Sequence, residues 1–331
     1  MTSISEELTV VEATGPSTFK NLNLFALRHP NSLESEPDYL LLEDAITQGL
    51  ARITEAGASG TISEVRFENN AEKPVLLLDG EELVGAMQDR VLNLTILAPP
   101  KRTTLIPVSC VEPGRWRMAT PEFRSAGDVM YTRARAARCA QVTACMRTSG
   151  TYGSDQAKVW DELAAKASRL GVDSPTGAMA AMYERHALLL EDYVRAFKWD
   201  EGQAGVLCAI GCLPLALDLF DHTGTMRRLF PKLVRSYALD ALDVRQPTIL
   251  PVDASLASEM LKDASWAPVF VQPSIGLGND VRFLSRTVSG SALWANGRYV
   301  HICAFPSDGT GNAEVFHTRM SRPTHRRGWT G

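Results

Sequence analysis

One stretch of the chain, residues 74–116, combines strand-like apolar runs with closely spaced polar residues. It reads PVLLLDGEELVGAMQDRVLNLTILAPPKRTTLIPVSCVEPGRW. Residues 75–78 are wholly apolar, the dipeptide Asp79-Gly80 favours a tight turn, and residues 104–108 predict a further strand. Polar groups gathered at strand ends are typical of a pocket rim. This stretch therefore predicts a fold built around strands, with a candidate site where they end.

The rest of the chain alternates between strand-rich and helix-rich segments. Residues 19–27 alternate apolar and polar side chains, which predicts a half-buried strand. Helical patterns occupy 39–50, 128–147, 154–170, 174–197, 226–242 and 255–261. Residues 205–220 predict two strands that turn at Gly211, and residues 287–305 predict a hairpin at Asn296-Gly297. Residues 75–86, 206–220 and 291–305 share one form, an apolar strand, a tight turn and a second strand.

These elements predict an α+β fold. Strand- and hairpin-rich N-terminal and C-terminal parts form mixed or antiparallel sheets around a central helical segment. We expect a single domain over residues 1–305, β-rich at 19–116, helical at 128–197 and mixed at 204–305. Residues 306–331 are predicted to be a flexible tail.

Composition narrows the class of protein. The apolar fraction of 45% and the net charge of −4 are ordinary for a soluble globular protein. No apolar run approaches the roughly 20 residues that span a bilayer, and the acidic N-terminus does not look like a signal peptide. The six cysteines include no CxxC pair, and no histidine falls at metal-ligand spacing. We therefore predict a cytoplasmic protein with no membrane contact and no metal site.

The motifs PVLLLDGEELVGA-x-Q-x-R, IPVSCVE-x-GRW, LALDLFD, FPKLVRSYALDAL and VSGSALWANGRYVH resemble one known family. It is the ARG and rhodanese-phosphatase-superfamily-associated protein domain, an uncharacterised family named for its association with ADP-ribosylglycohydrolases and rhodanese-phosphatases. The resemblance covers residues 19 to 305 and implies a role in nucleotide, ADP-ribose or RNA-repair processes. The resemblance also implies a lysine where this chain has Met87 and an asparagine where it has Asp89.

The carboxylates and the arginine of residues 81–90 are the first site candidates. Glu81 and Glu82 are neighbours, so on a strand they point to opposite faces and cannot form a close acid–base pair. Glu82 is a candidate general base, or else a salt-bridged surface residue. Gln88 and Arg90 share a strand face, and their amide and guanidinium suit phosphate or carboxylate binding as well as they suit a strand turn.

Residues 110–116 add a second group of candidates. Cys110 is a secondary candidate as a nucleophile, although no histidine is near it in sequence and a buried structural thiol is the favoured interpretation. Glu112 is the other catalytic candidate. The Pro113-Gly114 turn presents Arg115 and Trp116 together, a pair that can grip a phosphate and stack on a base, or that can simply anchor the turn.

Secondary candidates lie nearer the C-terminus. Asp218 sits in the LFD motif, and His301 sits on the last hairpin, where a hydrogen-bonded core histidine is the commoner role. Asp280 and Arg282 follow a glycine-rich loop that lacks the GK[ST] of a P-loop, which excludes that nucleotide-binding motif.

Two main functions remain open, and no cofactor is indicated. The first is binding or processing of a nucleotide-like anion, such as ADP-ribose or an RNA end, by a predicted rim of Glu82, Gln88, Arg90, Glu112 and Arg115. Nine basic against three acidic residues between positions 101 and 147 favour an anionic ligand or an RNA-facing surface, and equally a solvated helix face or a subunit contact. RNA is the weaker partner prediction, because aromatic residues are sparse in this segment. The second is a non-catalytic adaptor that forms homo-oligomers. Metal-assisted hydrolysis by the aspartates is a third, weaker option.

Overall fold

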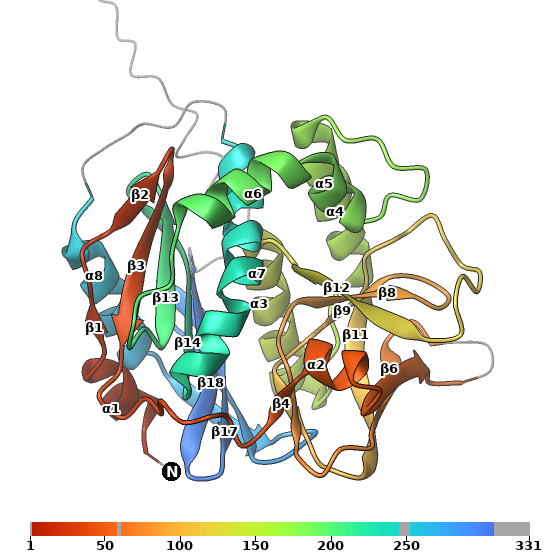
Figure 1. The fold of residues 1–331 in the computed structure, drawn as a ribbon, viewed down its shortest axis with the longest axis horizontal. Coiled ribbons are helices and arrows are strands. Elements are labelled where there is room, and N and C mark those ends of the chain that lie inside the picture. Colours follow the sequence, from red (N-terminus) through yellow and green to blue (C-terminus); the bar gives the residue numbers. More distant parts are fainter. Residues whose placement is uncertain (1, 58–60, 245–251, 308–331) are drawn as a thin grey trace, which may run out of the picture.

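The computed structural model describes residues 2–57, 61–244 and 252–307. A large antiparallel sheet stands beside a closed barrel, and the central helices pack between and over them (Figure 1). Helices and strands occupy separate segments of the chain, so the fold is α+β, as predicted.

The large sheet has nine strands, all paired antiparallel. The order is β1-β3-β13-β14-β18-β17-β16-β15, and β2 pairs with β3 away from this path. The strands are β1 (Glu12–Ala13), β2 (Ser17–Phe19), β3 (Leu22–Arg28), β13 (Gly205–Ile210), β14 (Leu213–Phe220), β15 (Val269–Pro273), β16 (Asn279–Leu284), β17 (Val288–Ala295) and β18 (Arg298–Pro306).

Helices cover both faces of this sheet. On one face lie α1 (Ile4–Thr9) and α8 (Ala254–Ser265), and on the other lie α3 (Thr132–Ser149), α6 (Ala187–Ala196) and α7 (Thr223–Leu242), as Figure 1 shows. In β13, Val206 and Cys208 pack in the core with α7, whereas Leu207 and Ala209 pack in the core with α8. This strand is continuously apolar because both of its faces are buried.

The barrel is closed by six strands in the order β11-β6-β5-β12-β8-β9. They are β5 (Ala51–Glu55), β6 (Glu64–Asn69), β8 (Glu81–Gly85), β9 (Arg90–Leu92), β11 (Arg102–Cys110) and β12 (Phe123–Val129). A three-stranded sheet joins β4 (Leu40–Leu41), β7 (Val75–Leu77) and β10 (Ile96–Ala98). The other helices are α2 (Leu42–Thr47), α4 (Gln156–Leu170) and α5 (Ala180–Arg185).

Two of the three predicted hairpins form. β13 pairs with β14 around Gly211, which has a φ of 56°, and β17 pairs with β18 around Asn296-Gly297, where Gly297 has a φ of 82°. The hairpin predicted at Asp79-Gly80 is wrong, because β7 pairs with β10 and β4 whereas β8 pairs with β9 and β12. The dipeptide turns the chain from the small sheet into the barrel wall instead.

Several predicted helix boundaries also need correction. The helix predicted from residue 128 begins at Thr132, because Asp128 still belongs to barrel strand β12. The helix predicted over 174–197 begins at Ala180 and is divided at His186, so it forms two shorter helices, α5 and α6. The helix predicted from residue 226 begins at Thr223, and Pro231 lies inside it.

Part of the predicted tail, residues 308–331, lies outside the described residues. None of the helices in the described ranges combines the length and the apolar character that crossing a bilayer requires.

Candidate functional site

The residues of the predicted rim lie on two faces of the barrel wall. β8 and β9 pair with Glu82 opposite Val91 and Leu83 opposite Arg90. Paired residues of antiparallel strands share a face, and neighbours along a strand point to opposite faces. Leu83 packs in the barrel core, whereas Val91 packs in the core that the helices form outside the barrel. Arg90 therefore points into the barrel and Glu82 points out of it, so they do not share one surface.

Arg90 is a fully enclosed guanidinium whose described partners are all neutral. Its Nη1 donates to Oε1 of Gln88 at 2.7 Å and lies 2.8 Å from Sγ of Cys110, and Nη2 donates to the carbonyl of Thr61 at 3.3 Å. The residue is 0% exposed, and its buried Nε has no hydrogen-bond partner in the described chain. No described carboxylate lies within the 4.0 Å of an ion pair. The carboxylate of Glu55 lies close enough to act electrostatically on the neighbouring Cys110, but it forms no described ion pair with Arg90. The guanidinium therefore has room for a directly bonded anion, since buried charges are normally paired.

The neighbours of Arg90 hold it in place. Gln88 donates from Nε2 to the carbonyl of Glu112, which turns its Oε1 towards Arg90. The ring of Trp116, which is 47% exposed, lies 5.5 Å from the centre of the guanidinium. Burial raises the pKa of the Cys110 thiol to about 11, although Arg90 opposes that rise. Cys110 is therefore a neutral thiol near pH 7, which does not suit a nucleophile.

Arg115, in contrast, is neutralised by its own chain. Its Nη2 lies 2.8 Å from Oδ1 of Asp89 and 2.6 Å from Oε2 of Glu112. Nη1 also donates to the carbonyl of Ala86 at 2.8 Å. Burial alone would raise the pKa of Glu112, but hydrogen bonding to Arg115 brings it below its ordinary value. This bidentate bridge ties the β8–β9 turn to the loop after β11, which is a structural role.

Glu82 is a buried carboxyl with no described partner. It is 0% exposed, and neither of its side-chain oxygens forms a hydrogen bond within the described residues. Burial raises its pKa well above the ordinary value, and the nearby carboxylates of Asp89 and Asp128 raise it further. A carboxyl that keeps its proton is an acid rather than a base. The pKa values of Glu82 and Glu112 are thus shifted in opposite directions, although both residues were candidates for the same chemistry.

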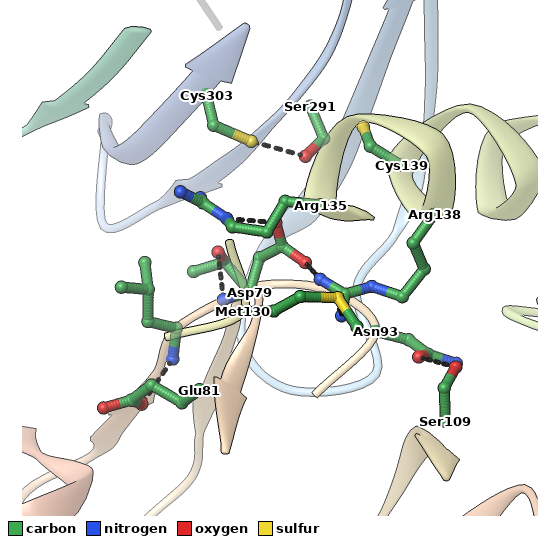
Figure 2. Close-up of polar contacts among 12 residues, drawn as sticks. Asp79, Glu81, Asn93, Ser109, Met130, Arg135, Arg138, Cys139, Ser291 and Cys303 are labelled. Atoms are coloured by element: carbon green, nitrogen blue, oxygen red, sulfur yellow. Dashed lines mark hydrogen bonds and ion pairs between the residues drawn. The ribbon is translucent and has the colours of Figure 1, made fainter. Parts of the chain in front are cut away.

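A second polar cluster lies where the barrel meets the large sheet. Figure 2 shows Asp79, at the corner before β8, between two arginines of α3. Arg138 donates to Oδ1 of Asp79, and Nε of Arg135 lies 3.4 Å from Oδ2. Arg135 also reaches Oδ1 of Asp218 on β14 at 2.8 Å. All four side chains are buried, and the charges pair with one another.

This cluster brings two secondary candidates together. The hydroxyl of Tyr237 donates to Asp218 at 2.7 Å, and Nε2 of His301 lies 3.2 Å from the same carboxylate. Burial alone would raise the pKa of Asp218, but Arg135 and His301 hold it well below its ordinary value. The other ring nitrogen of His301 is 2.8 Å from the hydroxyl of Thr95, close to the barrel. The cluster therefore joins the sheet to the barrel by charged hydrogen bonds.

The remaining candidates, Asp280 and Arg282, pair with each other on β16. Nε of Arg282 lies 2.9 Å from Oδ2 of Asp280, and both residues are at most 3% exposed. A Cβ on Gly278 would come within 2.0 Å of the Trp294 carbonyl, and one on Gly276 within 2.2 Å of the Leu97 carbonyl. These glycines allow close backbone packing rather than a phosphate cradle.

Sequence reasoning missed Asp79, Arg135, Arg138 and Tyr237. One signal was present, because Arg135 and Arg138 are three residues apart and share a helix face. Nothing in the sequence shows that this face meets the turn at Asp79, since 56 residues separate Asp79 from Arg135.

The chain belongs to the ARG and Rhodanese-Phosphatase-superfamily-associated Protein domain family, whose model matches residues 10–305. The family predicted from the motifs is confirmed. No curated protein and no solved structure matches the chain.

Proposed function

We propose that this chain binds a small nucleotide-like anion at the barrel end, with Arg90 as the residue that contacts the anion. The supporting observation is the guanidinium itself, which is buried, has an unpartnered Nε and has no described carboxylate in ion-pair range. An anion at Nε would supply the missing counter-charge and hydrogen bond together. ADP-ribose, another NAD-derived nucleotide and an RNA end are the ligand classes that present such a phosphate. No reaction is proposed.

Trp116 supports a nucleotide over a bare phosphate. Its ring is half exposed beside the guanidinium, where it offers a face on which a base can stack. Because Arg90 is fully buried, ligand entry requires the loop that carries Trp116 to move. Two features of this chain leave Arg90 as the main candidate for contact with the anion. Asp89 engages Arg115, and Met87 provides no charge where the family resemblance implies a lysine.

The test is isothermal titration with ADP-ribose, using ribose as the neutral control ligand. We expect Arg90→Met to weaken binding at least tenfold, since a charge-assisted hydrogen bond contributes about 1.5–3 kcal/mol. This substitution leaves no described carboxylate without its partner. Trp116→Ala removes a half-exposed ring and should weaken binding without unfolding the protein. Arg124→Gln, at an exposed position of β12, should bind like the wild type.

If ADP-ribose and 5′-phosphorylated RNA both fail to bind the wild type, the proposal is wrong. Equal binding by wild type and Arg90→Met would reject the named residue.

A non-catalytic module that forms homo-oligomers is the second candidate. The observation that favours it is β15, the last strand of the large sheet, which pairs only with β16 among the described strands. Val269, Phe270 and Val271 on this edge are 46%, 40% and 42% exposed. Long apolar edges are rare on monomers because they pair with other chains. A dimer in light scattering that Val271→Lys dissociates would support it, and a wild-type monomer would oppose it.

The metal-assisted hydrolase is not proposed. Within the described ranges, no three histidine, cysteine, aspartate or glutamate side chains are grouped so that they could hold a metal ion.

A further inference from the structure

A small polar cavity lies where α1 meets the ends of β3, β14 and β18. Its volume is about 140 Å³. That is room for several water molecules, or for a ligand of a few non-hydrogen atoms. Glu7, His29, Ser32, Asp221, Trp294 and Tyr299 contribute to its wall. None of these residues belongs to the barrel-end site.

The charged side chains that line this cavity are the carboxylates of Glu7 and Asp221 and the guanidinium of Arg298, together with the ring of His29. Asp221 and Asp38 share one cation, Arg298, whose Nε and Nη2 lie 2.6 Å from their respective carboxylates. Glu7 has no described cation within ion-pair distance other than the ring of His29. Nδ1 of His29 accepts a hydrogen bond from the backbone N–H of Asn31, so the neutral ring carries its proton on Nε2. Glu7 is therefore the carboxylate without a full counter-charge.

Two polar atoms in the cavity wall have no hydrogen-bond partner among the described residues. They are Nε2 of His29, a side chain that is 9% exposed, and the hydroxyl of Ser32. Nε2 lies 3.2 Å from Oε1 of Glu7, but the angle is too poor for a hydrogen bond. The imidazole N–H of His29 therefore lacks a hydrogen-bond acceptor, which a ligand in the cavity could provide, and the hydroxyl of Ser32 can donate to the same acceptor.

Aromatic side chains also line the cavity. Trp294 and Tyr299 pack edge to face with their ring centroids 4.8 Å apart, and both contribute to the cavity. Organic ammonium ions are attracted to aromatic faces, and the attraction grows when the site is shielded from water. A ligand that carries both a cationic group and a hydroxyl can contact the carboxylate and the aromatic rings and can accept from the unpartnered hydrogen-bond donors.

We propose that this cavity binds a small amino alcohol in its ammonium form. The ammonium group contacts Glu7 and the aromatic wall, and the hydroxyl oxygen accepts from His29 and Ser32. An ethanolamine ion, with four non-hydrogen atoms, matches the cavity volume. This proposal is independent of the anion site at Arg90, because the two sites share no residue.

The test is isothermal titration of the full chain with ethanolamine at neutral pH and constant ionic strength. The ligand-efficiency ceiling for four non-hydrogen atoms limits the Kd to no less than about 0.04 mM, and we expect a Kd of about 0.1–1 mM. Ethylammonium, which lacks the hydroxyl, and ethylene glycol, which lacks the charge, should each bind at least tenfold more weakly. We expect Glu7→Gln to abolish binding and Glu12→Gln, at an exposed position of β1, to leave it unchanged.

The ligand series tests the wild type alone, so the result does not depend on the folding of a variant. No saturable heat up to about 20 mM ethanolamine would mean that the cavity holds only water, and the proposal would be overturned. Ethylene glycol binding as tightly as ethanolamine would overturn the role of charge. Ethanolamine binding unchanged in a folded Glu7→Gln variant would place the ligand elsewhere.

Discussion

Replacing Glu82 by glutamine should stabilise the protein at neutral pH. Glu82 is fully buried, neither carboxyl oxygen has a described partner, and burial raises its pKa well above the ordinary value of 4.5. In the unfolded chain the group releases its proton near that ordinary value. Each pH unit above it at which the folded protein keeps the proton costs 1.36 kcal/mol of stability. This cost grows with pH until the folded protein itself releases the proton.

The sign of this linkage defines the assay. Because the folded pKa of Glu82 is the raised one, the wild type loses stability as the pH rises above the ordinary glutamate value. Glutamine has nearly the same shape and no charge to lose. Urea unfolding should therefore give equal free energies for the two proteins near pH 4, and the variant should become more stable as the pH rises to 7. Contributions from other titrating groups cancel in the difference between the two curves.

Glu81→Gln is the matched control. Its Oε2 accepts from the backbone N–H of Leu78 at 3.0 Å, and its Oε1 lies 3.3 Å from Nζ of Lys232. Neutralising this paired carboxylate should destabilise the protein at pH 7, the opposite direction to Glu82. A Glu82→Gln variant that is less stable than the wild type at pH 7 would refute the reasoning. A stability difference that is the same at pH 4 and pH 7 would also refute it.

Three further predictions follow from the described contacts. Asp218→Asn should lower the free energy of unfolding by about 3–5 kcal/mol at pH 7, because it leaves buried Arg135 short of its partner. The stability that the lowered pKa of Asp218 provides should be lost as the pH falls below the ordinary aspartate value of 3.8, which urea unfolding across the acid range would measure. Cys110 in the folded protein should resist iodoacetamide at pH 8 while exposed Cys212 reacts, as judged by peptide mass spectrometry; rapid alkylation of Cys110 would contradict its pKa of about 11. Gly278→Ala should lower Tm far more than Gly297→Ala. Both glycines have a φ above 80°, but only a Cβ at Gly278 would clash with backbone, since it would lie 2.0 Å from the Trp294 carbonyl oxygen. Equal shifts in Tm would contradict this.

Local sequence patterns predicted the elements whose partners lie next to them. Asn296-Gly297 forms its hairpin because the turn type is set by these two residues and both flanking strands are apolar. The family motifs and the α+β class were also readable from the sequence, and both are confirmed. Asp79-Gly80 has a similar turn composition, yet its two strands enter different sheets. Turn chemistry fixes the bend but not the partner of each strand.

The candidate site was harder to predict because local patterns do not show which distant segments pair with one another. Period-two alternation correctly separated Glu81 from Glu82. Gln88 does lie beside Arg90, but it belongs to the turn between β8 and β9 rather than to the strand that the prediction assumed. It could not show that Glu82 and Arg90 lie on opposite sides of a closed barrel, because that depends on the pairing of β8 with β9. Whether an arginine has a counter-ion depends on residues far along the chain. Arg115 and Arg90 look equivalent in sequence, and only the contacts distinguish a neutralised arginine from one without a carboxylate.

The central claim is that Arg90 is a buried cation awaiting an anionic ligand. The most direct measurement is the 15N NMR signal of its Nε–H, assigned by its loss in Arg90→Met, during a titration with ADP-ribose. The account predicts a saturable change of this signal, because Nε is the atom without a described partner. An Arg90 Nε–H signal that stays unchanged at saturating ADP-ribose would contradict the account.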